Sequence, residues 1–161
     1  MLPLLSNPVS ARTDQSQLLT RYEQDAGAIV TRARLDRGYL AEQLSFLSNL
    51  PAELASPRLQ GYRATFTALA ANQASTPWQK LKLLRESRSL FAQALAAAPD
   101  SWELRFLRLM VERSLPKQLC AQSQIAADAK YLSECLEQRG LFTESQRQQV
   151  IAHLDLTELS R

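Results

Sequence analysis

Apolar residues recur at intervals of three and four along most of the chain, which is the spacing of one face of an α-helix. The pattern predicts seven helices, near residues 14–34, 36–49, 56–72, 77–97, 100–116, 117–138 and from 143 onward. The chain has 29 Leu and 22 Ala against 3 Ile and 4 Val, and strands favour β-branched residues. We therefore expect an all-α fold, with consecutive helices paired as antiparallel hairpins in a stack or bundle.

Capping motifs mark several of the expected helix starts, because a side-chain oxygen there can accept a hydrogen bond from a free backbone N–H. The motifs are Ser56-Pro57, Thr76-Pro77 with Gln79, Asp100 with Glu103, and Thr143 with Gln146. Gly140 is placed to end helix 117–138, since glycine is common just past a C-cap. The loops between these boundaries are short, which favours antiparallel packing of neighbours.

A single domain spanning residues 1–161 is the simplest organisation, because 45% apolar content at this length can form a substantial core. Residues 1–12 are expected to form an irregular N-terminal arm. No apolar run approaches the roughly 18 residues that span a bilayer, so no membrane span is expected. The opening lacks a basic segment typical of a secretory signal, although a signal removed earlier would leave no trace. With only two cysteines, a cytoplasmic location is the expectation.

The net charge of +3 is confined to one expected helix. Helix 77–97 carries Lys80, Lys82, Arg85 and Arg88 against Glu86, while the other residues balance at 15 basic and 15 acidic. So small an excess, scattered around a helix, is more typical of a solvated surface than of a phosphate-binding track. The charge pattern therefore does not favour nucleic-acid binding.

Residues suited to catalysis or metal binding are few. The two cysteines, Cys120 and Cys135, fall on one expected helix too far apart to form a disulfide within it, and the single histidine is His153. These three cannot complete a closed zinc site by themselves, and the four glycines are isolated rather than gathered in a phosphate-binding loop. We expect no catalytic residues, no metal and no cofactor, and a protein that is not an enzyme.

Helix 100–116 places Arg105 and Arg108 among large apolar residues. At about 100° per residue, Arg105, Arg108 and Glu112 form one polar stripe about 60° wide. In a structural interpretation, Arg108 pairs with Glu112, and Arg105 pairs with helix-end carbonyls or with Asp128 on the next helix. In a functional interpretation, the two guanidinium groups bind a carboxylate or phosphate of a ligand. The first interpretation is favoured, and these four residues are the candidate polar cluster.

Helix 56–72 presents two different faces. Tyr62 and Phe66 belong to its face of large residues and are our candidates for lining an open groove. Gly61, Ala64 and Ala68 form a strip of small residues, which lets another helix approach closely.

The stretch 87–99 resembles part of a tetratricopeptide repeat. Ser87, Phe91, Ala94 and Pro99 match the small, aromatic, Ala, Pro pattern of the second helix of such a repeat, over about one half-repeat. The following residues depart from that pattern, because polar residues at 105, 108 and 112 and a leucine at 109 stand at positions that need other types. The string ELRFLR also resembles one found in a group of uncharacterised bacterial helical proteins.

The tetratricopeptide resemblance implies a concave face that binds peptides or partner helices. The function expected first is therefore a non-enzymatic helical protein–protein interaction domain that binds a peptide, a partner helix or a second copy of itself. The alternative is a small anionic-ligand-binding helical protein that uses the Arg105 and Arg108 pair.

Overall fold

The structure, a computed structural model, describes residues 8–158. All regular structure in that range is helical, which confirms the predicted all-α class. The helices are α1 (Pro8–Leu35), α2 (Arg37–Ser48), α3 (Pro57–Gln73), α4 (Pro77–Ala97), α5 (Trp102–Arg113), α6 (Gln122–Leu136) and α7 (Glu144–Glu158).

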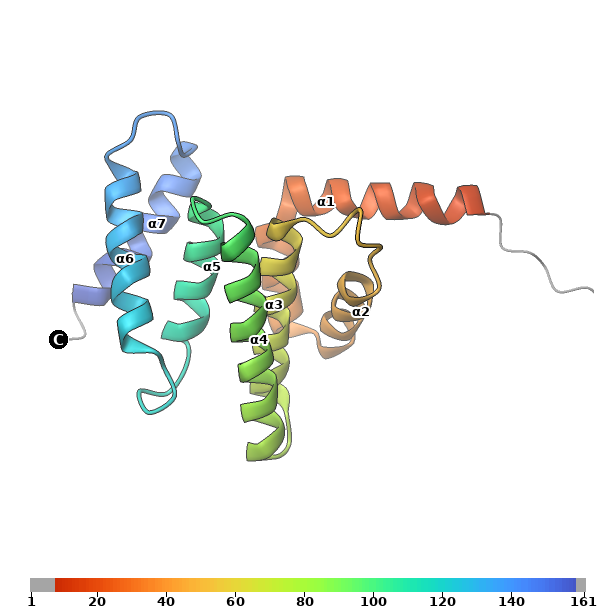
Figure 1. The fold of residues 1–161 in the computed structure, drawn as a ribbon, viewed down its shortest axis with the longest axis horizontal. Coiled ribbons are helices and arrows are strands. Elements are labelled where there is room, and N and C mark those ends of the chain that lie inside the picture. Colours follow the sequence, from red (N-terminus) through yellow and green to blue (C-terminus); the bar gives the residue numbers. More distant parts are fainter. Residues whose placement is uncertain (1–7, 159–161) are drawn as a thin grey trace, which may run out of the picture.

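The first helix differs from the prediction at its start and near its middle. We expected an irregular arm over residues 1–12, but α1 begins at Pro8, so the prediction is wrong for residues 8–12, while residues 1–7 lie outside the described range. Proline suits a helix start because its missing N–H would have no partner there. At Asp25 the backbone leaves helical geometry (φ −136°, ψ 29°). Figure 1 shows the part of α1 before this kink extending away from α3 and α4.

Three of the four predicted capping motifs cap their helices. The Ser56 hydroxyl accepts from Leu59 N–H, and the Thr76 hydroxyl accepts from Gln79 N–H. Thr143 and Gln146 form a reciprocal capping box, in which each side chain accepts from the other residue's N–H. These hydrogen bonds satisfy donors that the first helical turn leaves free.

Three further helix ends were predicted wrongly. The N-cap of α5 is Ser101 rather than Asp100, and the Ser101 hydroxyl accepts from Leu104 N–H. Helix α6 begins at Gln122 instead of 117, because a turn in which Leu119 and Cys120 N–H donate to the Pro116 carbonyl comes first. The helix also ends before Gly140, which lies in the following loop at φ 81°.

Helix α3 lies at the centre of the packing and contacts α1, α2, α4 and α5 (Figure 1). The largest apolar cluster joins these five helices around the buried rings of Tyr22, Phe66 and Phe91. A second cluster, around Leu109, Leu132 and Val150, joins α5, α6 and α7. The described chain is therefore a series of helices in which α5 belongs to both clusters.

The small-residue strip of α3 is a close contact between helices, as expected. The Ser87 hydroxyl of α4 donates to the Ala64 carbonyl at 2.7 Å, and both residues are buried. A Cβ placed on Gly61 would lie 2.2 Å from Cδ2 of Leu104 in α5. Glycine at 61 thus sets how closely α3 and α5 can pack.

Candidate functional site

The arginine stripe of α5 meets Asp128, a fully buried carboxylate on α6. Arg108 donates from Nε and Nη2 to the two carboxylate oxygens at 2.8 and 2.7 Å, which is the paired geometry of a strong charge-assisted contact. Arg105 Nη1 lies 3.4 Å from Asp128 Oδ1, and Nη2 donates to the Pro99 carbonyl at 3.2 Å. The Arg105 guanidinium also lies 4.2 Å from the Tyr131 ring centroid. The structure therefore brings three of the four candidate residues together.

Glu112, the fourth candidate, pairs with Arg88 of α4 and not, as we predicted, with Arg108 of its own helix. Its carboxylate accepts from Arg88 of α4 at 2.7 and 2.9 Å and from Ala121 N–H at 2.9 Å, whereas the predicted partner was Arg108. Arg88 also donates to the Leu119 carbonyl. Since Arg108 is held by Asp128, the i, i+4 pair that sequence spacing suggests does not form. Glu112 instead ties α4 to the loop before α6.

The hydrogen bonds to Glu112 decide its protonation. Burial alone raises the pKa of a carboxyl group, but the hydrogen bonds from Arg88 and Ala121 outweigh burial and hold the pKa of Glu112 below its usual value. The Arg88 pKa is raised by the same bond to Glu112. The pair is therefore ionised near neutral pH, and its hydrogen bonds connect α4, α5 and the loop before α6.

An external anion has little access to the two arginines. Their side chains are only 23% and 14% exposed for Arg105 and Arg108, and a ligand would have to displace Asp128, which is 0% exposed. Neither arginine lines the large pocket between α1, α3, α5 and α7. Neither lines either of two smaller hollows, one in the α6–α7 region and one between α2, α3 and α4. This arrangement favours the structural interpretation of the stripe.

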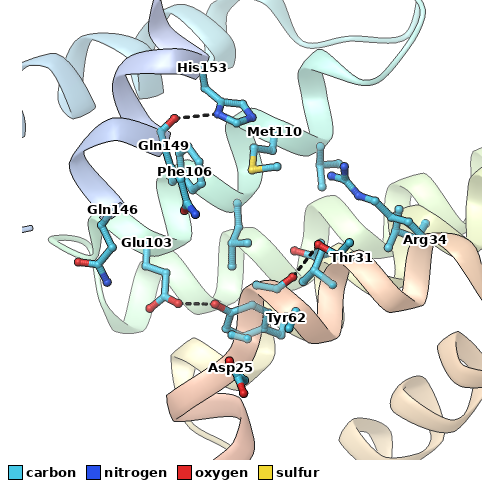
Figure 2. A pocket seen from close by; sticks show the side chains of 18 of the residues that line it. Asp25, Thr31, Arg34, Tyr62, Glu103, Phe106, Met110, Gln146, Gln149 and His153 are labelled. Carbon is cyan, nitrogen blue, oxygen red and sulfur yellow. Dashed lines mark hydrogen bonds between the residues drawn. The ribbon is translucent and has the colours of Figure 1, made fainter. Parts of the chain in front are cut away.

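The opposite side of α5 lines a pocket of about 890 Å³. The walls come from α1, α3, α5 and α7, so the odd-numbered helices build it (Figure 2). At 100° per residue, the pocket-lining residues of α5 centre roughly 180° from the arginine stripe. Trp102, Phe106 and Met110 are among them, and all three are only partly buried.

A hydrogen-bonded group joins α3 and α5 at one wall of the pocket. Glu103 accepts from Arg58 Nε at 2.8 Å and from the Tyr62 hydroxyl, as Figure 2 shows for the tyrosine. This explains why Glu103 does not complete the capping box predicted with Asp100. Burial, then the Glu103 charge, raises the pKa of Tyr62 well above its usual value, so the phenol stays a neutral donor.

His153 lies at the α7 wall. Its Nδ1 lies 2.8 Å from the Gln149 carbonyl, and its ring packs edge-on against Phe106 with centroids 5.2 Å apart (Figure 2). Arg113 of α5 donates to the His153 carbonyl. The histidine is thus positioned by an aromatic ring and backbone groups rather than by a carboxylate.

Of the two residues predicted to line a groove, only Tyr62 does so. Phe66 is fully buried, with its ring 6.3 Å from that of Tyr22, so it lies in the core and the prediction is wrong for it. Phe106 and Met110, which follow Trp102 at steps of four, were not among the residues predicted to line a groove. That spacing is equally typical of a helix face buried in the core. Only the position of the neighbouring helices therefore distinguishes a pocket-lining face from a core face.

Comparison with known protein families, with curated proteins and with solved structures finds no significant match to this chain. Among the residues whose side chains the structure describes, no cluster of three or more His, Cys, Asp or Glu is arranged to hold a metal ion. Over residues 8–158, no helix is both long enough and apolar enough to cross a bilayer. The residues of the pocket itself therefore carry the functional argument.

Proposed function

We propose that the chain is a non-enzymatic helical interaction domain that binds a short peptide segment of a partner protein in the pocket between α1, α3, α5 and α7. The observation that carries this proposal is the composition of the pocket, which combines an apolar floor with polar side chains that have no partner in the described structure. A volume of about 890 Å³ is in the range of ligand sites and is large enough for several peptide side chains.

The floor of the pocket offers apolar surface to a ligand. Phe106 and Met110 of α5 and Leu69 of α3 line it and are only partly buried. Methionine and aromatic side chains are typical of protein-binding surfaces, because they bury much apolar area and adapt to different partners.

Side-chain amides surround this floor. Gln24 of α1, Asn72 and Gln73 of α3, and Gln149 of α7 all line the pocket, and no side-chain hydrogen bond forms at any of these four amides within residues 8–158. Each amide offers both a donor and an acceptor, which match the C=O and N–H of a peptide backbone. An apolar floor with such amides suits a peptide better than a small anion.

Two titratable groups of the pocket, Glu103 and His153, have contacts that support binding rather than catalysis at these two positions. Glu103 is held by Arg58 and Tyr62, and His153 Nδ1 lies against a backbone carbonyl. A general acid or base must instead be free to reach a reacting proton.

The order of helix contacts supports the tetratricopeptide-like part of the proposal. Helix α3 packs against both α1 and α5, while α2 and α4 each pack between successive odd-numbered helices. In stacked helical hairpins, such packing gives one set of helices a shared concave surface that binds partners. The pocket walls all belong to that one set.

The proposal can be tested by selecting peptides from a displayed library of random short sequences and comparing two variants of α1. Thr31 lines the pocket and Thr20 does not, yet both are exposed and both hydroxyls donate to the carbonyl four residues earlier at 2.9 Å. Thr31→Trp should fill the pocket and abolish binding of the selected peptides, whereas Thr20→Trp should leave binding unchanged.

Equal binding to both tryptophan variants would contradict the proposal, as would failure to select any peptide. Sedimentation of the purified protein provides a second measurement. A concentration-dependent dimer that is lost in Thr31→Trp but kept in Thr20→Trp would assign the pocket to self-association instead.

A further inference from the structure

The charges around the pocket are separated into two ends. Glu23 and Asp25 lie at the kink of α1, and Arg34 lies in the last turn of the same helix. In the view of Figure 2, Asp25 is on the same side of the pocket as Tyr62 and Glu103, while the Arg34 side chain, on another side, reaches from α1 toward α5. At 1.5 Å per helical residue, the backbone of Asp25 and that of Arg34 are roughly 13 Å apart.

Each end keeps a net charge within the described part of the chain. At the acidic end, Glu23, Asp25 and Glu103 accompany a single cation, Arg58, which pairs with Glu103 at 2.8 Å and also interacts with the charge of Glu23, so a net negative charge remains. No ion pair involves Glu23, Asp25 or Arg34 among residues 8–158. By contrast, the arginines on the other side of α5 both contact Asp128.

We infer that the pocket selects peptides that carry a basic residue and, about four residues away, a carboxylate. This inference rests on the proposed peptide-binding function. An extended chain advances about 3.3 to 3.6 Å per residue, so four residues cover the roughly 13 Å between the two ends. The basic residue lies against Glu23 and Asp25, the carboxylate lies against Arg34, and the intervening side chains contact the apolar floor.

Four pools of synthetic peptides test this charge pattern. The pools have the forms Lys-x-x-x-Glu, Glu-x-x-x-Lys, Lys-x-x-x-Lys and Glu-x-x-x-Glu, with x varied and both peptide ends blocked. At least one of the two mixed-charge pools should bind roughly five-fold more tightly than either like-charge pool, and added salt should reduce the difference. Repeating the comparison with free C-termini shows whether the carboxylate comes from an acidic side chain or from the chain end.

Charge reversal at the basic end gives a sharper test. Arg34→Glu makes both ends acidic, so the preference should move from the mixed pools to Lys-x-x-x-Lys. Arg21→Glu is the matched control, because Arg21 is an exposed arginine of the same helix that does not line the pocket. Arg21→Glu should keep the original preference. Arg34→Gln, which removes the charge without reversing it, should weaken the preference without inverting it.

Equal binding of the four pools, or a preference unaffected by Arg34→Glu, would overturn this inference. Such a result would leave the proposed function standing if library peptides still bind in a Thr31-dependent manner. If no library peptide binds either, the proposed function fails together with the inference.

Discussion

The two sides of α5 differ in how their polar groups are satisfied. On one side, Arg105 and Arg108 contact the buried carboxylate of Asp128, and Glu112 accepts three hydrogen bonds from Arg88 and Ala121. On the other side, partly buried apolar residues face a pocket in which the amides of Gln24, Asn72, Gln73 and Gln149 make no side-chain hydrogen bond within the described range. A charge on an apolar helix is conspicuous in a sequence, but here the conspicuous charges hold helices together. The surface suited to binding lies on the opposite face, where the apolar residues have the same spacing as core residues.

This difference predicts that the arginine side controls stability and the pocket side controls binding. Substitutions on the arginine side should lower the free energy of unfolding and leave peptide specificity unchanged. Substitutions on the pocket side should change peptide binding and leave the free energy of unfolding almost unchanged. Four experiments, taken from the largest expected effect to the smallest, test this separation.

The largest effect is expected at Asp128. Asp128→Ala leaves Arg105 and Arg108 without their shared carboxylate and should lower the free energy of unfolding by about 3 kcal/mol. This is the lower end of the range for buried pairs, since both arginines keep some contact with water. Urea denaturation measures the change. Glu134→Ala, at an exposed site on α6, is the control and should change stability by less than about 0.5 kcal/mol.

A pH-dependent effect is expected at Glu112. Glu112→Gln should cost about 2 kcal/mol at neutral pH, because it removes a buried charge-assisted contact with Arg88. The pKa of Glu112 is lowered in the folded state, so its contribution is present above the unfolded-state pKa of about 4.3 and is lost as pH falls through the lower folded-state value.

Denaturation of wild type and Glu112→Gln at a series of pH values tests whether this contribution to the free energy of unfolding is lost as pH falls. The two stability curves should converge as the solution becomes more acidic than about pH 4. Glu42→Gln, at an exposed site on α2, should parallel wild type throughout. A constant gap between wild type and Glu112→Gln down to the lowest pH would contradict the assignment.

Two glycine substitutions should shift stability in opposite directions. Gly61→Ala places a methyl 2.2 Å from Leu104 Cδ2 and should cost about 1 to 2 kcal/mol, since Leu104 is fully buried and cannot move freely. Gly27→Ala in α1 meets no atom within 4 Å and should stabilise by up to about 1 kcal/mol. Thermal denaturation of both variants measures the two shifts, and equal shifts of one sign would argue against close α3–α5 packing.

The smallest effect on stability is expected at the pocket. Gln149→Ala removes an exposed amide that has no side-chain hydrogen bond in the described structure, so stability should change by less than about 0.5 kcal/mol while peptide affinity falls. Gln148→Ala is the neighbouring control on α7; Gln148 donates to Glu144 and does not line the pocket. Peptide titration should distinguish the two variants, and equal affinities would remove Gln149 from the site.

Local sequence patterns predicted the helices well and most of their starts. Ser56, Thr76 and Thr143 each cap a helix as their motifs indicate, because these hydrogen bonds depend only on residues within one turn. The start of α1 was missed, because the helix begins at Pro8 rather than near residue 14.

Errors arose where a distant partner competes with a local one. Glu103 bonds to α3 instead of completing a capping box, and Glu112 bonds to Arg88 instead of Arg108. These partners lie 24 to 45 residues away in the chain, so helical spacing alone cannot reveal them. The pocket is also made by four separate helices, and its apolar residues have the same periodicity as core residues.

The missing side chain at Gly61 has a consequence for the width of the pocket. Helices α3 and α5 are two of its walls, and their separation is limited by the contact between Gly61 and Leu104. A methyl group at position 61 would act as a wedge that moves these two walls apart. The absence of a methyl group at position 61 therefore sets the width of the pocket. A substitution at this residue, which does not line the pocket, would change the size of the ligand that the pocket accepts.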